Sequence, residues 1–139
     1  MIKHKSKKDV CDFSYLSCMM GRKKHLILRI MDLFLKEIPE ELRSLKNAIK
    51  NKDYPAIRSL SHIMKSSVAI MGISTLKPVL QQMEDICTIT TGPDSLRVVT
   101  RREEKIKKLN QKLRVICRQA LEEVQKINST HTGLFLATS

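Results

Sequence analysis

The sequence is poor in the residues on which β-structure usually depends. Aromatic residues make up only 4% of its 139 residues, tryptophan is absent, and glycine and proline number four each. Strands favour aromatic and β-branched side chains, and sandwiches and barrels need many glycine- and proline-rich turns. Apolar residues still make up 42% of the chain, which is enough for a core of leucine, isoleucine and methionine. We therefore expect one all-α domain.

The cysteines lack the spacing of a metal site or a redox pair. No C-x-x-C motif and no zinc-binding separation occurs among Cys11, Cys18, Cys87 and Cys117. No apolar run reaches the roughly 20 residues of a membrane span. Asp9 and Asp12 interrupt any signal sequence near the start. We expect reduced thiols, no bound metal, no membrane partner, and a cytoplasmic protein or a cytoplasmic piece of a larger one.

Positive charge is in excess, with a formal net charge of +12. Part of it lies in residues 1–9, which we expect to form a disordered basic arm. Much of the rest lies on the last predicted helix, at Arg97, Arg101, Arg102, Lys105, Lys107, Lys108, Lys112, Arg114 and Arg118. A basic surface favours acidic partners, whether nucleic acid, anionic lipid or an acidic protein. A solvated face without any partner explains the same charge, so charge alone selects no function.

Apolar residues recur at steps of three and four along most of the chain, which is typical of amphipathic helices. The pattern predicts a short helix over 13–20 and longer helices over 23–50, 53–71, 74–87 and 95–127. Pro39 should kink the second helix or start a new one, and Gly72 suits the left-handed residue that ends the third. Short connections favour antiparallel neighbours. We therefore expect an antiparallel up-down four-helix bundle over 10–128, with a short extra N-terminal helix and a disordered tail over 129–139.

The predicted helix over 53–71 carries a histidine on its polar face. At about 100° per residue, the apolar side chains share one sector that must face the core: Ile57, Leu60, Met64, Val68 and Met71. His62 lies nearly opposite this sector. Lys65 and Ser66 occupy the positions three and four residues later, where a second metal ligand would stand, and this disfavours a metal site. An ordinary surface histidine remains an open alternative at this point.

Lys65 places a positive charge beside His62 on this face. Side chains three residues apart on a helix are neighbours, so the Lys65 ammonium can neutralise phosphate oxygens on a modified His62. The residues around them suit the approach of another protein: the small Ser66 and Ala69, the cation Arg58, and the apolar Ile63 and Ile70. The two isoleucines either form an apolar docking rim or pack beside a neighbouring helix, and the sequence leaves both alternatives open.

These residues also form a recognisable motif. Ser61-His62-Ile63-Met64-Lys65-Ser66-Ser67, followed by Met71-Gly72-Ile73, resembles the H-x-x-K-G-[SA]-[SA]…G signature of histidine-containing phosphotransfer (HPt) domains. The similarity extends to Asp12–Leu16, to Leu33–Pro39 and to the helical hairpin over Ala56–Asp85. The family has glycine after the lysine, where this chain has Ser66. That departure bears on the choice of partner more than on the activity.

The resemblance implies a four-helix bundle that carries a phosphoryl group between proteins. His62 matches the phosphoacceptor, Lys65 the phosphate-stabilising lysine, and Glu84 a polar position that can orient the imidazole. The implied partners are response-regulator receiver domains, including those of hybrid histidine kinases, which supply the aspartate and a Mg²⁺. The chain itself then needs no cofactor. Because it has no glycine-rich ATP lid, it should be a phosphoryl carrier and not a kinase, and we expect a monomer.

Two other functions fit parts of the sequence. A basic helical module that binds nucleic acid fits the charge, but it leaves the His62 face unexplained and offers few aromatic residues for stacking on bases. We therefore expect no nucleic-acid partner. An HPt-like bundle that only docks partners fits the serine at position 66, although the presence of both His62 and Lys65 argues against it.

Overall fold

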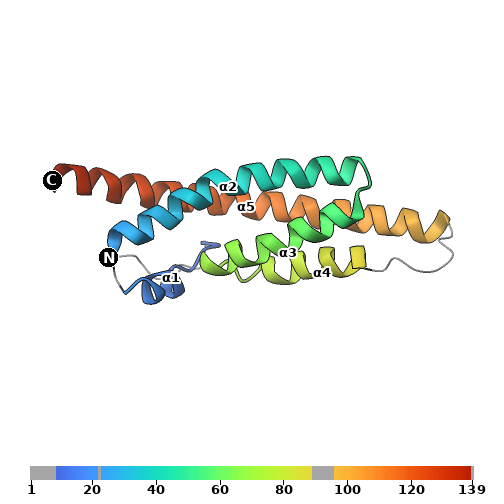
Figure 1. Ribbon diagram of the computed structural model, residues 1–139, viewed down its shortest axis with the longest axis horizontal. Coiled ribbons are helices and arrows are strands. Elements are labelled where there is room, and N and C mark those ends of the chain that lie inside the picture. The colour runs from blue at the N-terminus through green and yellow to red at the C-terminus, as the bar shows by residue number, and fades with distance from the viewer. Residues whose placement is uncertain (1–8, 22, 89–95, 139) are drawn as a thin grey trace.

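The described part of the chain folds into a bundle of α-helices. The computed structural model describes residues 9–21, 23–88 and 96–138. Over these ranges it has five helices and no strand: α1 (Ser14–Met19), α2 (Lys24–Lys50), α3 (Tyr54–Ile70), α4 (Leu76–Thr88) and α5 (Leu96–Thr138). In Figure 1, α2 lies along α5 on one side and the shorter α3 and α4 lie on the other. The most extensive contacts join α2 to α3, α3 to α4, α4 to α5 and α5 to α2. The predicted antiparallel four-helix bundle with a short extra N-terminal helix is confirmed.

The helix ends follow from local residue chemistry. The Asp53 carboxylate accepts a hydrogen bond from the Ala56 backbone N–H at 3.2 Å and so caps the start of α3, with Pro55 in the first turn. Pro39 does not end α2, which continues through it to Lys50 and bends near its middle in Figure 1. None of the described helices combines the length and the apolar character that crossing a bilayer requires.

One helix boundary differs by more than two residues from the sequence-based prediction. α5 ends at Thr138, and not at Ile127 where the regular apolar pattern stops. In Figure 1 its C-terminal part extends beyond the start of α2. An amphipathic pattern reports burial against a partner, so it is lost where a helix projects past its neighbours. The predicted disorder of 129–139 in solution stays a prediction, and the basic arm over residues 1–8 lies outside the described residues.

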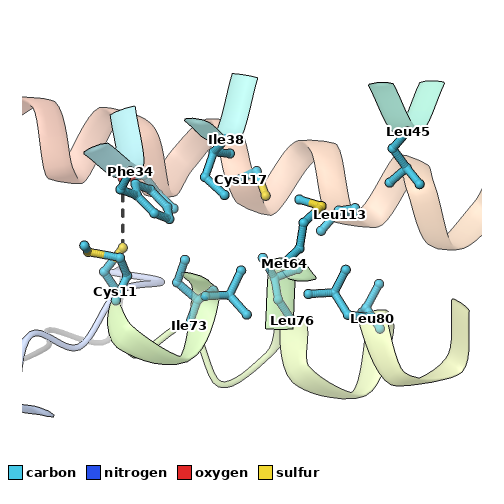
Figure 2. Packing of buried hydrophobic residues seen from close by; sticks show 14 of the residues in the cluster. Cys11, Phe34, Ile38, Leu45, Met64, Ile73, Leu76, Leu80, Leu113 and Cys117 are labelled. Atoms are coloured by element: carbon cyan, nitrogen blue, oxygen red, sulfur yellow. Dashed lines mark hydrogen bonds between the residues drawn. The ribbon is translucent and has the colours of Figure 1, made fainter. Parts of the chain in front are cut away.

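The predicted apolar stripes meet in one core. The residues with fully buried side chains include Met31, Ile38, Leu45, Met64, Leu76, Leu80 and Leu113, most of which are drawn in Figure 2. α3 contributes Ile57, Met64 and Val68, as its periodicity predicts. Leu60 is only half-buried, and the fully buried position beside it is Ser61, whose hydroxyl donates to the Ile57 carbonyl at 2.7 Å. A local bond of this kind lets a serine hydroxyl enter a helical core.

The N-terminal segment 9–13 closes one end of the bundle. The Glu123 carboxylate on α5 accepts hydrogen bonds from the backbone N–H groups of Val10, at 2.9 Å, and Cys11, at 3.0 Å. The Asp12 N–H donates to the Met71 carbonyl at 3.0 Å, which joins the segment to the turn between α3 and α4. Cys11 and Phe13 are buried. The segment therefore fixes the α3–α4 hairpin against α5.

The four free thiols differ in burial, which predicts how they react. Cys18 is exposed, whereas Cys11, Cys87 and Cys117 are buried. Burial raises the pKa of the Cys87 thiol to about 11 and that of Cys117 to about 12, and it raises the pKa of Cys11 further, with help from Glu123. Because the thiolate is the nucleophile, we expect a disulfide reagent at pH 8 to modify one thiol rapidly in the native protein and four in urea. Cys18→Ser should remove the rapid phase. Rapid native modification of a second thiol would contradict this burial pattern.

Candidate functional site

α3 places the His62 side chain on the outer surface of the bundle. The side chain is 68% exposed, on the face opposite the buried Ile57, Met64 and Val68. The backbone beneath it is well anchored, because α3 and α4 share the most extensive helix contact and Ser61 is fully buried. The imidazole is thus accessible to another protein on a rigid support.

Glu84, on α4, orients the ring. Its Oε1 lies 2.9 Å from His62 Nδ1. An ionised carboxylate can only accept a hydrogen bond, so Nδ1 carries the proton and donates it. The lone pair of the neutral ring then resides on Nε2. The position that the family resemblance indicated from the sequence therefore does contact the histidine in the structure.

Lys65 contacts the same carboxylate from the other side. Its Nζ lies 2.5 Å from Glu84 Oε2, and the two side chains are 23% and 15% exposed. The hydrogen bond from Lys65 lowers the pKa of the Glu84 carboxyl; partial desolvation opposes this shift, and the hydrogen bond from His62 adds to it. A depressed folded-state pKa means that the stabilisation is fully present above the unfolded value and is lost as pH falls through the folded one. Glu84 is therefore ionised at neutral pH and bridges His62 and Lys65.

Two further residues complete the cluster, and both were absent from the predicted site. Lys65 Nζ donates to Gln81 Oε1 at 2.9 Å, and Gln81 Nε2 donates to Asp85 Oδ1 at 2.9 Å. Both side chains stand on α4, where Gln81 lies three residues before Glu84 and four before Asp85. That spacing puts Gln81 next to each of them on the helix surface, so the sequence indicates that these three α4 side chains are neighbours, but not that Gln81 meets Lys65.

The cluster can do one kind of chemistry well. An exposed imidazole with a free Nε2 is a nucleophile. A carboxylate behind Nδ1 stabilises the positive charge that the ring gains when Nε2 forms a bond. A neighbouring ammonium offers charge to an anionic group. These features suit a residue that accepts and returns a phosphoryl group.

Comparison with known proteins agrees with this chemistry. A model of the Hpt domain family matches residues 29–127, which cover most of α2, all of α3 and α4, and most of α5. The chain belongs to the Hpt domain family. Among curated proteins, the comparison finds no match. Hpt domains are helical bundles that take part in histidine phosphotransfer in two-component phosphorelays and interact with receiver domains, so the resemblance seen in the sequence is confirmed.

Most of the residues predicted for docking lie on the outer surface of this Hpt domain. Arg58, Ser66 and Ala69 are exposed on α3, and Ile63 is 54% exposed beside His62. Ile70 differs, because it is half-buried and packs against the core. Of the two alternatives for the isoleucines, an apolar rim fits the position of Ile63 and packing fits that of Ile70. Their contacts with a partner remain predictions.

Proposed function

We propose that His62 is the phosphoacceptor of this Hpt domain, and that it takes a phosphoryl group from the aspartyl-phosphate of one receiver domain and passes it to another. The observation that carries this proposal is the ring itself, 68% exposed and hydrogen-bonded through Nδ1 to Glu84 at 2.9 Å. This arrangement leaves Nε2 as the nucleophilic nitrogen on an accessible face.

The transfer step follows from that geometry. The Nε2 lone pair attacks phosphorus, the Nε2–P bond forms, and the P–O bond to the receiver aspartate breaks with its electron pair leaving on the carboxylate. No proton has to leave the ring, because Nδ1 keeps its hydrogen and continues to donate it to Glu84. The ring gains positive charge, which the adjacent Glu84 carboxylate stabilises. The reverse step returns the phosphoryl group to a second receiver.

Lys65 contributes charge beside the reacting nitrogen. Its ammonium is held at the cluster through Glu84 Oε2, at 2.5 Å. From there it can share the negative charge of the transferring phosphoryl oxygens. We expect the receiver to bring the Mg²⁺ that neutralises the remaining charge, so that this chain needs no cofactor of its own.

The proposal also includes the role of the protein in a phosphorelay. The domain acts as a monomeric cytoplasmic carrier and receives its phosphoryl group from other proteins, without an ATP site of its own. Exposed Arg58, Ile63, Ser66 and Ala69 form the surrounding docking face. The basic character of the chain, with its net charge of +12, favours encounter with the acidic phosphorylation pocket of a receiver.

Mapping the phosphoryl group tests the proposal directly. After incubation with a phosphorylated receiver domain, we expect the label on the tryptic peptide Ser59–Lys65, in which His62 is the sole histidine. The digest is analysed at neutral or alkaline pH, because a phosphoryl group on imidazole is lost in acid. Label on another peptide, or an acid-stable label on a serine of this peptide, contradicts the proposal.

A further inference from the structure

The Lys65 side chain is more ordered than is usual for a long side chain on a helix surface. A lysine side chain on a helix surface ordinarily samples many rotamers, and ordering it has a cost in conformational entropy. Here the side chain is only 23% exposed and its Nζ has two acceptors, Glu84 Oε2 at 2.5 Å and Gln81 Oε1 at 2.9 Å. Both acceptors stand on α4, so the ammonium spans the α3–α4 interface. This ordering precedes any arrival of a phosphoryl group.

The two acceptors differ in what they do to the charge of Lys65. Glu84 is ionised, so it holds the ammonium but also neutralises part of its charge. Gln81 is neutral, so it holds the ammonium without reducing the charge available to phosphoryl oxygens. A second carboxylate at position 81 would hold Lys65 equally well, but it would repel the incoming phosphoryl group.

Asp85 decides which way the Gln81 amide points. A glutamine amide can present either its oxygen or its NH₂ group to a neighbour. The Asp85 carboxylate can only accept, and it takes the Gln81 Nε2 hydrogen at 2.9 Å. The amide oxygen is thereby turned toward Lys65, the orientation in which it can accept from an ammonium.

We propose that Gln81, with its amide oriented by Asp85, is a positioning residue that holds the Lys65 ammonium ready beside His62. This inference rests on the proposed function of His62. It extends the transfer site along α4 to a glutamine and an aspartate that act on the phosphoryl group through Lys65. The advantage is preorganisation, because an ammonium already in place need not be ordered during transfer.

The first test is Gln81→Met, which keeps the length of the side chain and removes the acceptor. We expect the rate of transfer from a saturating phosphorylated receiver to fall about fivefold, the value of one ordinary hydrogen bond. The receiver concentration at half-saturation should not change, because Gln81 acts on the transfer step. Gln82→Met, at the neighbouring exposed position of α4, is the matched control and should leave the rate unchanged.

A double-mutant cycle then shows whether Gln81 acts through Lys65. In a Lys65→Met background, Gln81→Met should cause no further loss, since no ammonium remains to be held. A fivefold loss that persists in that background overturns the inference, and so does an unchanged rate for Gln81→Met alone. Label that fails to depend on His62 would instead overturn the proposed function, so the two failures are distinguishable.

Asp85→Asn tests the orientation of the amide. Asparagine can donate as well as accept, so it no longer determines which way Gln81 turns. We expect a loss of about twofold in the wild-type background, less than removal of a full hydrogen bond. In the Gln81→Met background the same change should have no effect. A loss of equal size in both backgrounds shows a general effect of the Asp85 charge and contradicts the proposed role of Asp85.

Discussion

Replacing His62 by glutamine should abolish phosphoryl transfer from a phosphorylated receiver while leaving the fold intact. A glutamine amide can still donate a hydrogen bond to Glu84, but its nitrogen lone pair is delocalised and is not nucleophilic. The imidazole is 68% exposed and contributes nothing to the buried core. We therefore expect a change in unfolding free energy within about 0.5 kcal/mol, as is usual for surface positions. Label transfer and urea unfolding, measured on the same sample, separate the two effects.

The chain supplies a matched control in His25, an exposed histidine on α2. His25→Gln makes the same chemical change outside the α3–α4 cluster, so it should transfer at the wild-type rate. If His62→Gln accepts label as well as the wild type, the phosphoacceptor lies elsewhere. If both variants lose transfer, the effect of His62→Gln is not specific to the proposed site.

Helix α3 illustrates what periodicity predicts reliably. Its apolar residues place Ile57, Met64 and Val68 inside and His62 outside, and the structure agrees. Periodicity gave no reason to bury Ser61, because a hydroxyl counts as polar whatever bond it makes. The bond to the Ile57 carbonyl removes the cost of burying it. The periodicity of the apolar residues therefore identified the exposed face of α3 correctly. It did not identify every residue of the buried face, because a local hydrogen bond allows Ser61 to be buried there.

The candidate site shows what helical periodicity cannot predict, which is the contact between side chains on different helices. Glu84 was expected on the strength of a family resemblance, and its contact with His62 joins residues on two helices. Gln81 and Asp85 were missed because their role depends on the register between α3 and α4. This register determines which α4 side chain the Lys65 ammonium reaches. Side-chain periodicity assigns a residue to a face, but not to a level along a neighbouring helix.

The N-terminal segment shows the same limit over a longer span of sequence. Nothing in the local sequence near Val10 and Cys11 indicates that their backbone N–H groups meet Glu123 on α5. The segment has no regular structure of its own at that point, so its donors must find acceptors elsewhere. A half-buried carboxylate acceptor more than a hundred residues away satisfies them. Only the assembled bundle brings those groups together.

Gly72→Ala should destabilise the protein severely. Gly72 has φ +67°, a left-handed conformation that costs an L-residue roughly 1–2 kcal/mol. An added Cβ would also lie 1.9 Å from the Asp12 carbonyl oxygen and 2.7 Å from its carbon, and both are backbone atoms that cannot rotate away. The methyl group must displace the segment that carries the buried Cys11 and Phe13. We expect a loss of more than about 4 kcal/mol in urea unfolding followed by circular dichroism.

Gly21→Ala separates the two causes of that loss. Gly21 also has a left-handed backbone, with φ +58°, but nothing lies within 4 Å of an added Cβ. It should therefore show the conformational cost alone, roughly 1–2 kcal/mol. Equal losses at the two glycines would show that the approach of Asp12 is unimportant. If the larger loss occurs at Gly72, its cause is the closure of the α3–α4 turn by the N-terminal segment. That turn holds α3 against α4, and the bridge from His62 through Glu84 to Lys65 depends on that packing.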